Sequence, residues 1–222
     1  MSPRRRIDLS LYLVAGSDVV PERSLRDVVL AAVSNGVTAV QLRQKQGSTR
    51  GFIEEARALI MVLRPLAIPL IINDRVDVAL AAGADGVHVG QTDMDPRDAR
   101  RLIGDARLLG LSVTNLAEAR VVDAAIVDYV GVGPVFATPS KLDAAPPLGV
   151  SGTSEICAVL RIPAVAIGGI TCANAGDVLS AGVDGLAVIS AICGAERPDE
   201  AAAALAKQVL AARARRAERR VS

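Results

Sequence analysis

The sequence predicts a single α/β domain in which eight parallel strands close into a (β/α)8 barrel with helices on the outside. Short apolar runs alternate with helical stretches through nearly all of the 222 residues, and this alternation implies parallel strands joined by right-handed crossovers. There are eight such units, the number that closes a barrel. Most strand runs end at a polar or charged residue or at a glycine. A barrel gathers these strand ends onto one face, where its active site lies.

The units can be followed along the chain. We expect strands near 11–15, 37–42, 68–72, 86–89, 107–112, 128–132, 163–167 and 185–189, and helices near 24–35, 51–64, 75–82, 95–103, 115–124, 152–160, 172–181 and 198–216. Three helical stretches are followed by a glycine before the next strand, at Gly36, Gly83 and Gly182. Glycine suits this place because it adopts the left-handed turn that ends a helix.

Helix starts are also marked. Asp95 fits as an N-cap before Pro96, since proline suits the first turn of a helix. Asn115 with Glu118 has the spacing of a capping box. We place the TIM-barrel catalytic domain at residues 10–210, between a basic N-terminal extension (1–9) and a basic C-terminal tail (211–222). The tail could contact RNA or an acidic partner, but a solvated helix end is the simpler interpretation.

Composition narrows the classes of function. Apolar residues make up 51% of the chain, enough for a large core, whereas aromatic residues make up 2%, which argues against base stacking with single-stranded nucleic acid. Three cysteines without CxxC spacing argue against a disulfide framework or a zinc site and fit a reducing cytoplasm. No apolar run reaches the ~18 residues that span a bilayer. We expect a soluble cytoplasmic protein that binds small molecules and neither nucleic acid nor membranes, and an oligomer stays open.

A cluster of polar side chains follows the second strand. Period-two alternation puts Gln41 and Arg43 on one face, together with Lys45 if the chain stays extended. An amide, a guanidinium and an ammonium group on one side can bind the edge of a heterocycle and a diphosphate. A surface ion-pair cluster is the alternative.

Two carboxylates follow the third and fourth strands. Asp74 ends one apolar run and Asp93 lies just beyond the next. Mg²⁺ prefers oxygen ligands and usually binds through one or two carboxylates plus substrate phosphates, so we expect a magnesium site there. Asp93 could instead cap the following helix, although Asp95 fits that role better, and Asp74 could pair with Arg75.

The carboxyl ends of the last three strands carry groups suited to phosphates. A long connection at 133–152, which we expect to act as a partly mobile lid, contains Thr138, Ser140 and Lys141, two hydroxyls followed by a movable positive charge. The glycine pair 168–169 and Ser190 follow strands seven and eight, whose loops commonly bind phosphate in barrels of this kind.

His88 is the single histidine of the chain. Its place within an apolar strand favours a core or supporting role over that of a catalytic base. There is no Ser-His-Asp set and no second histidine for zinc. The predicted site therefore binds charge rather than moving protons.

Taken together, these motifs resemble the thiamine-phosphate synthase family over about residues 10 to 205. The matching stretches are QLRQK at 41–45, INDR at 72–75, GVHVGQTD at 86–93, GPVFATPSK at 133–141, PLG at 147–149, AIGGI at 166–170 and VIS at 188–190. Two positions depart from the family pattern. Thr114 stands where a histidine is frequent, and Ser140 stands where threonine is usual but keeps the hydroxyl.

The resemblance implies a transferase that joins 4-amino-2-methyl-5-hydroxymethylpyrimidine diphosphate to 4-methyl-5-(2-hydroxyethyl)thiazole phosphate with Mg²⁺, by early departure of diphosphate. It implies contacts with the pyrimidine diphosphate from Gln41, Leu42, Arg43, Gln44, Lys45, Asn73, Ser112 and Lys141. It implies contacts with the thiazole phosphate from Thr138, Pro139, Ser140, Gly169, Ile189 and Ser190. Asp74 and Asp93 would bind Mg²⁺, and Arg43, Lys45, Ser112 and Lys141 would be the catalytic residues.

Two alternatives stay open. A related thiazole tautomerase resembles this fold but relies on a histidine near position 114, which this chain lacks. A barrel that only binds thiamine intermediates would be expected to lose the cations or carboxylates, and these are present.

Overall fold

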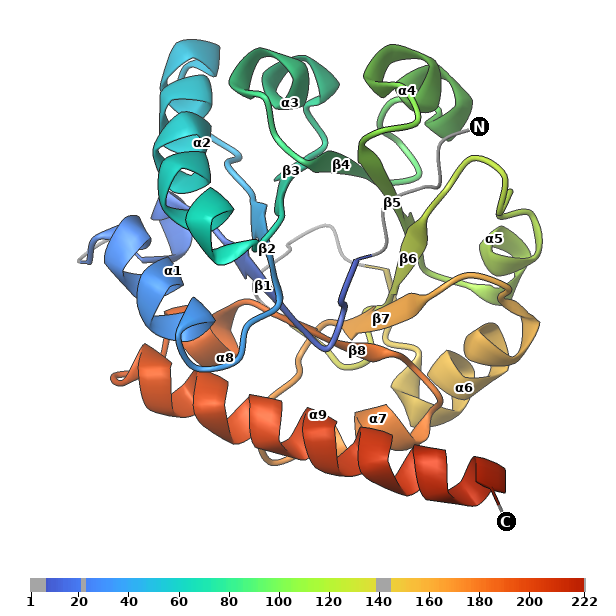
Figure 1. Ribbon diagram of the computed structural model, residues 1–222. Helices are drawn as coiled ribbons and strands as arrows, with labels where there is room; N and C mark the ends of the chain where they lie inside the picture. Colours follow the sequence, from blue (N-terminus) through green and yellow to red (C-terminus); the bar gives the residue numbers. More distant parts are fainter. Residues whose placement is uncertain (1–6, 21–22, 139–144, 222) are drawn as a thin grey trace.

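Eight parallel strands form a closed barrel in the computed structural model of the chain, which confirms the predicted fold class (Figure 1). The structure describes residues 7–20, 23–138 and 145–221. Each strand pairs with the next along the chain, and β8 pairs with β1 to close the ring. The strands are β1 (Leu11–Ala15), β2 (Ala39–Leu42), β3 (Leu70–Asn73), β4 (Gly86–Val89), β5 (Leu108–Val113), β6 (Tyr129–Val132), β7 (Ala164–Ile167) and β8 (Gly185–Val188).

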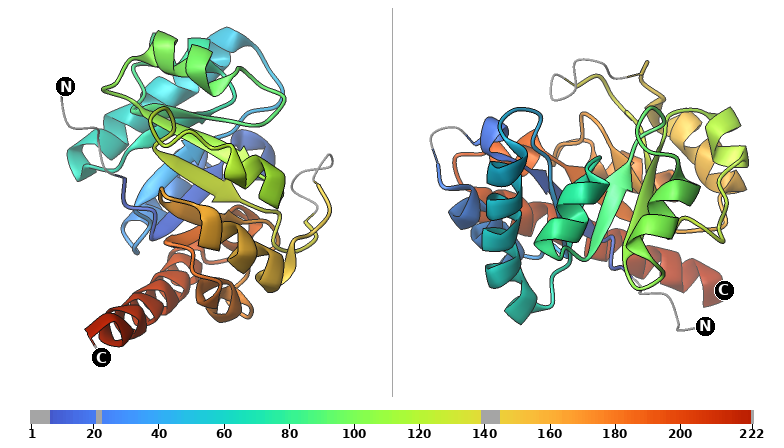
Figure 2. Two further views of the ribbon diagram at one scale, coloured as in Figure 1. Left: turned by 90° about the vertical axis from the view of Figure 1, so that its right-hand side faces the viewer. Right: turned by 90° about the horizontal axis from the view of Figure 1, so that it is seen from above.

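Helices surround the ring. They are α1 (Leu25–Val33), α2 (Thr49–Leu63), α3 (Val76–Ala82), α4 (Pro96–Ile103), α5 (Leu116–Arg120), α6 (Gly149–Val159), α7 (Ala175–Ser180), α8 (Ser190–Cys193) and α9 (Pro198–Val221), with short 3-10 turns at η1 (Ser17–Val19) and η2 (Arg64–Leu66). Figures 1 and 2 show the long α9 crossing the outside of the barrel, where it packs on α1, α7 and α8.

Two strands begin two residues later than expected. The prediction started the third strand at residue 68, whereas β3 begins at Leu70, because Pro69 has no amide hydrogen for a ladder. The second strand was expected from residue 37, but the amide of Val37 still donates to the carbonyl of Ala32 at the end of α1. The short helix α8 was not predicted, and α9 continues past the expected end at 216.

The local signals at helix ends are confirmed. Gly36, Gly83 and Gly182 have φ angles of 104°, 75° and 97°, in the left-handed region that glycine tolerates. The side chain of Asp95 accepts a hydrogen bond from the Arg97 amide and caps α4. Asn115 caps α5 by accepting from the Glu118 amide.

Two apolar cores follow from the alternation along each strand. One lies between the barrel and its helices and contains the outward-facing side chains, such as Leu13 and Leu42. The other fills the barrel interior and contains Tyr12, Ile71, Leu108, Tyr129 and Val165. Because inward and outward positions alternate, the same strands supply both cores and the polar groups above the inner one.

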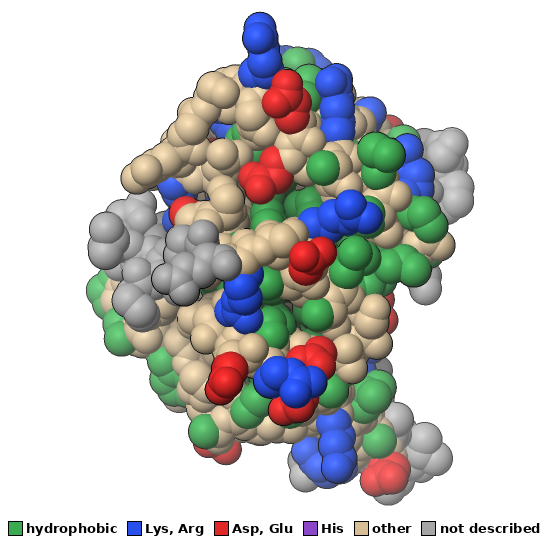
Figure 3. Space-filling view, turned by 90° about the vertical axis from the view of Figure 1, so that its left-hand side faces the viewer, with side chains coloured by type: hydrophobic (Ala, Val, Ile, Leu, Met, Phe, Trp, Pro, Cys, Tyr) green, Lys and Arg blue, Asp and Glu red, His purple; other side chains and the backbone are tan. Residues whose placement is uncertain are grey.

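Figure 3 shows the face over α1 and α2, where acidic and basic side chains are interspersed. All three cysteines are free thiols. Among the residues that the structure describes, no helix is both long and apolar enough to span a membrane.

A buried ion pair ties the amino ends of β5 and β6 to α4, on the side of the barrel opposite the strand carboxyl ends. Arg100 and Asp128 lie 2.5 Å apart, and each side chain is 7% exposed. The Arg100 guanidinium also donates to the carbonyls of Gly104, Arg107 and Ile126, at 2.8, 2.7 and 3.0 Å. The hydrogen-bonded guanidinium of Arg100 and its pair with Asp128 therefore hold α4, β5 and β6 together.

Removing the arginine would leave the Asp128 carboxylate buried and without its cation. We predict that Arg100→Ala lowers the free energy of unfolding by about 3–5 kcal/mol, measured by urea denaturation. Arg101→Ala is the matched control, since Arg101 is 77% exposed where it pairs with Asp98, and exposed pairs contribute about 0–1 kcal/mol. Equal losses in the two variants would contradict the assignment.

Candidate functional site

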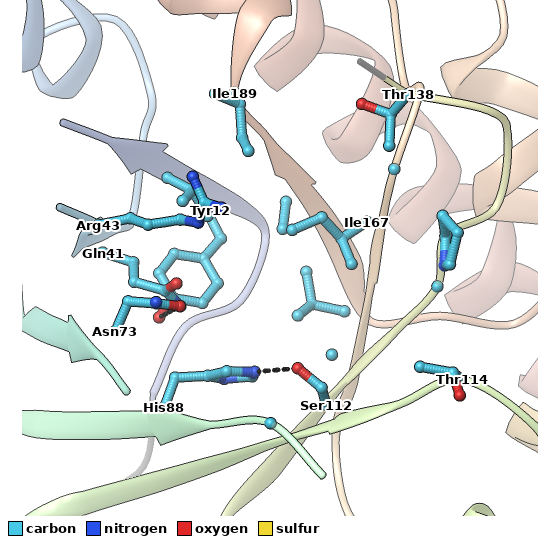
Figure 4. Close-up of a pocket in the computed structure, with 18 of the residues that line it drawn as sticks. Tyr12, Gln41, Arg43, Asn73, His88, Ser112, Thr114, Thr138, Ile167 and Ile189 are labelled. Atoms are coloured by element: carbon cyan, nitrogen blue, oxygen red, sulfur yellow. Dashed lines mark hydrogen bonds between the residues drawn. The ribbon is translucent and has the colours of Figure 1, made fainter. Parts of the chain in front are cut away.

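A cavity of about 330 Å³ opens at the carboxyl ends of the barrel strands. That volume lies in the range of pockets for small organic ligands. Most of the side chains that the sequence assigned to a site meet in its lining: Gln41, Arg43, Lys45, Asn73, Asp74, Asp93, Ser112, Thr138, Gly169, Ile189 and Ser190. Figure 4 shows Gln41, Arg43 and Asn73 on one side and Thr138, Ile167 and Ile189 on the other.

Two of the assigned residues lie elsewhere. Leu42 is fully buried in the core between barrel and helices, because it alternates with the inward-facing Gln41 and Arg43. The half-buried Gln44 does not line the cavity, and its Oε1 atom is buried with no partner among the described residues. Pro139, Ser140 and Lys141 lie outside the described residues, as does part of the expected lid.

Basic groups and carboxylates adjoin at one side of the cavity. The Nζ atom of Lys45 lies 3.3 Å from Oδ2 of Asp74, with the two side chains 47% and 26% exposed. Arg43 and Asn73 line the same cavity. Because these groups are partly open to solvent, they are free to exchange partners when a charged ligand binds.

The backbone directs Asp74 toward Asp93. Asp74 has φ of 63°, a left-handed conformation that is uncommon for a residue with a side chain but is tolerated by Asp. Its amide donates to the carbonyl of His88 at 2.8 Å, which fixes this turn to β4. Asp93 is held in a tight turn, since its Oδ2 accepts from the Gly90 amide at 2.7 Å.

The two carboxyl groups interact. Burial raises the pKa of Asp74 above its ordinary value, and the adjacent Asp93 raises it further, whereas Lys45 acts in the opposite direction. Two neighbouring carboxylates that repel each other favour a bound cation. The described residues hold no cluster of three or more His, Cys, Asp or Glu side chains that could bind a metal. A pair of carboxylates is enough for Mg²⁺, which usually keeps waters and substrate oxygens as its other ligands.

The opposite side of the cavity is built from backbone turns after β7 and β8. Gly168 and Gly169 have φ angles of 103° and 63°, and the loop after β6 packs on them through a bond from the Phe136 amide to the Gly168 carbonyl, 3.0 Å. The Asn174 side chain holds the Gly169 carbonyl at 2.9 Å. Ser190 begins α8 and lines the same cavity as this turn. Rigid turns with close backbone approach suit an oxyanion.

Neutral polar groups form the base of the cavity, and sequence reasoning missed most of them. Gln41 Nε2 donates to the Tyr12 hydroxyl at 3.0 Å, and the hydroxyls of Tyr12 and Tyr129 are 2.9 Å apart. Tyr129 then contacts His88 Nδ1 at 3.2 Å, and His88 Nε2 contacts Ser112 Oγ at 3.0 Å (Figure 4). The signal was available in part, because Tyr12 has the inward parity of Val14 on β1 and both tyrosines of the chain are in strands.

Thr114 stands at the rim of the cavity, at a position where the family often has histidine, and its contacts show what this difference changes. Its amide and hydroxyl both bind the carboxylate of Glu118, at 2.7 and 3.0 Å. The Ser112 hydroxyl is instead supported from below by His88, and its carbonyl accepts from Gln91 Nε2 at 2.6 Å. Thr114 thus secures the start of α5, whereas Ser112 is held by His88 and Gln91.

Most of the chain is similar to known proteins. Residues 11–192 match the family model described as thiamine monophosphate synthase. The chain is 54% identical over 206 residues to a thiamine-phosphate synthase of Xanthobacter autotrophicus, covering 93% of this chain and 98% of that protein. It is 52% identical over 194 residues to one of Albidiferax ferrireducens, covering 87% and 89%. A solved thiamine phosphate pyrophosphorylase from Pyrococcus furiosus superposes with a TM-score of 0.84 at 38% identity, over 92% of this chain and 97% of that one.

The turn at Gly169 provides a direct test of the built cavity wall. A Cβ atom at Gly169 would lie 2.7 Å from both the Ala137 carbonyl oxygen and Phe136 Cβ. We predict that Gly169→Ala destabilises the fold by about 1–3 kcal/mol in urea denaturation and weakens phosphate binding in calorimetry.

Gly83→Ala is the matched control. Gly83 has a similar φ of 75°, but its Cβ would have nothing within 4 Å, so this variant reports backbone strain alone. A Gly169→Ala loss no larger than that of Gly83→Ala, with phosphate binding intact, would show that the wall is not tightly packed there.

Proposed function

Because the chain belongs to the thiamine monophosphate synthase family, we propose that its cavity joins a pyrimidine diphosphate to a thiazole phosphate. The substrates would be 4-amino-2-methyl-5-hydroxymethylpyrimidine diphosphate and 4-methyl-5-(2-hydroxyethyl)thiazole phosphate, and the products thiamine phosphate and diphosphate. The protein is a transferase, in keeping with relatives that are 54% and 52% identical to it over 206 and 194 residues. The observation that supports this reaction most directly is the meeting of two carboxylates and two cations in one cavity.

The bond that breaks joins the pyrimidine methylene carbon to the diphosphate oxygen, and the bond that forms joins that carbon to the thiazole nitrogen. Positive charge develops on the methylene as the diphosphate leaves, and the ring amino group stabilises it. The protein has to stabilise the charge of the leaving group and orient the nucleophile. Arg43 and Lys45 suit the first task, because they line the cavity beside the carboxylates.

The residues present fit Mg²⁺. Asp74 and Asp93 supply oxygen ligands, and a divalent ion would relieve the repulsion between them. Lys45, which contacts Asp74, could then bind a phosphate oxygen in its place. When bound, the ion would supply positive charge to the departing diphosphate. Asn73 and Ser112 would complete the pyrimidine side.

The thiazole phosphate would occupy the opposite wall. Gly169, Ile189 and Ser190 line the cavity, and Thr138 lies on the same side as Ile189. Roles for Pro139, Ser140 and Lys141 rest on the sequence resemblance. No general base is required by this reaction, which agrees with a His88 ring whose two nitrogens both face hydroxyl groups.

Incubation of the purified protein with both substrates and Mg²⁺ tests the proposal. We expect thiamine phosphate and diphosphate to form in equal amounts, as measured by chromatography. Thiazole isomerisation without coupling would identify a tautomerase, and tight substrate binding without any product would identify a binding protein. Either outcome would reject the proposed reaction.

The metal assignment predicts a specific defect in Asp93→Asn. The amide keeps the side-chain size but loses the negative charge, so turnover at limiting Mg²⁺ should fall by about 10²-fold, with partial recovery at high Mg²⁺. Steady-state rates across a magnesium titration measure both effects.

Asp98→Asn provides the control on the following helix, where the side chain is 54% exposed and lies outside the cavity lining. It should keep the wild-type magnesium dependence. An unchanged magnesium dependence in Asp93→Asn would remove Asp93 from the metal site.

A further inference from the structure

We propose that the buried chain of hydrogen bonds from Gln41 through Tyr12, Tyr129 and His88 to Ser112 is a positioning device with one direction. It holds His88 as the tautomer protonated on Nε2. The Ser112 hydroxyl can then donate a hydrogen bond to a ligand in the cavity, and the Gln41 side-chain carbonyl can accept one from that ligand. This inference rests on the proposed function for its kinetic consequence but not for its structural content.

The hydrogen-bond chain crosses the barrel beneath the cavity. It links β2, β1, β6, β4 and β5 through four contacts of 3.0, 2.9, 3.2 and 3.0 Å. Tyr12 and Tyr129 are 1% and 0% exposed, and their rings meet edge to face at 5.9 Å. Polar groups buried this deeply require partners, and each hydroxyl here has two.

The strands make room for the chain by carrying glycine beside it. His88 on β4 pairs with Gly110 on β5, and Gly110 pairs with Tyr129 on β6. A Cβ atom at Gly110 would overlap His88 Nδ1 and the Tyr129 phenol, so any side chain there would break their contact. Gly131 would place a Cβ 3.2 Å from the His88 ring. The contact between His88 and Tyr129 thus depends on the absence of a side chain between them.

Proton counting sets the direction. Gln41 turns its Nε2 toward Tyr12, and an amide nitrogen can only donate. Tyr12 accepts from Gln41, so the arrangement in which each buried hydroxyl accepts once and donates once puts the Tyr12 proton on the bond to Tyr129 and the Tyr129 proton on the bond to Nδ1 of His88. Burial raises the pKa of both phenols, so each keeps the proton it donates. His88 must carry its own proton on Nε2 and donate it to Ser112 Oγ.

The direction of the hydrogen bonds matters at the two ends of the hydrogen-bond chain, Gln41 and Ser112. Ser112 Oγ receives its hydrogen bond from His88, so its own proton is free to donate to an acceptor in the cavity. Gln41 lines the cavity, and no group in the described part of the protein bonds to its Oε1 atom. The cavity therefore offers an acceptor at Gln41 and a donor at Ser112. An aminopyrimidine diphosphate matches both, with amino hydrogens to donate and ring nitrogens or phosphate oxygens to accept.

The single histidine allows a direct test. In tag-free protein labelled with ¹⁵N-histidine, the imidazole nitrogens at neutral pH should show Nε2 protonated and Nδ1 unprotonated. Tyr129→Phe removes the hydroxyl that donates to Nδ1 and should shift the ring to a mixture of tautomers. Thr153→Val, which deletes another buried hydroxyl outside the chain, should leave the spectrum unchanged.

Protonation on Nδ1, protonation of both nitrogens, or a spectrum that Tyr129→Phe does not alter would each overturn the inference. These outcomes do not depend on activity. A protein without synthase activity that still shows the expected tautomer would reject the proposed function and leave the hydrogen-bond chain in place.

Kinetics test the consequence for catalysis. Tyr129→Phe should lower kcat about tenfold, the equivalent of one well-placed hydrogen bond, with KM for both substrates nearly unchanged and urea denaturation showing a folded protein. In a Ser112→Ala background the same substitution should have little further effect, because the chain acts through that hydroxyl. Independent, multiplicative losses in the double variant would show that Tyr129 does not act through Ser112 and would overturn this role.

Discussion

Closure of the parallel barrel is the constraint on which the site depends. In a closed ring every strand has two neighbours, so its register is set from both sides. The pairing of Asn73 with His88, of His88 with Gly110, and of Gly110 with Tyr129 follows from this register. Groups that are distant in sequence then share one height in the barrel, and those just past the strand ends share one rim.

Polarity changes with depth along the barrel axis. The interior begins with apolar side chains such as Leu108 and Val165, continues through the neutral hydroxyls and imidazole, and ends with charged groups at the rim. Neutral polar groups tolerate burial when they are hydrogen-bonded, whereas charges need water or a charged ligand. In the proposed reaction, the rim is therefore where Lys45 would exchange Asp74 for diphosphate and Asp74 would exchange Lys45 for magnesium.

The sequence was sufficient for the fold class and for much of the rim, because both depend on local pattern. Alternation along the chain predicted the strands. The prediction that Asp95 caps the helix left Asp93 available for the site. Within the stretch 41–45, alternation turns the Leu42 side chain to the outer core, so only part of this stretch presents side chains to the cavity. The chain from Tyr12 to His88 was beyond sequence reasoning, because it depends on the register of strands that are up to 117 residues apart. The left-handed turn at Asp74 likewise depends on its bond to β4.

The central claim is that the strand ends form one cavity in which a metal and a diphosphate bind together. A crystal structure of the protein soaked with Mn²⁺ and diphosphate tests it most directly, because the anomalous signal locates the ion. The account predicts one ion bound by Asp74 and Asp93, bridged to a diphosphate that also contacts Arg43. An ion and a diphosphate found at separate places, or an ion that avoids both carboxylates, would contradict it.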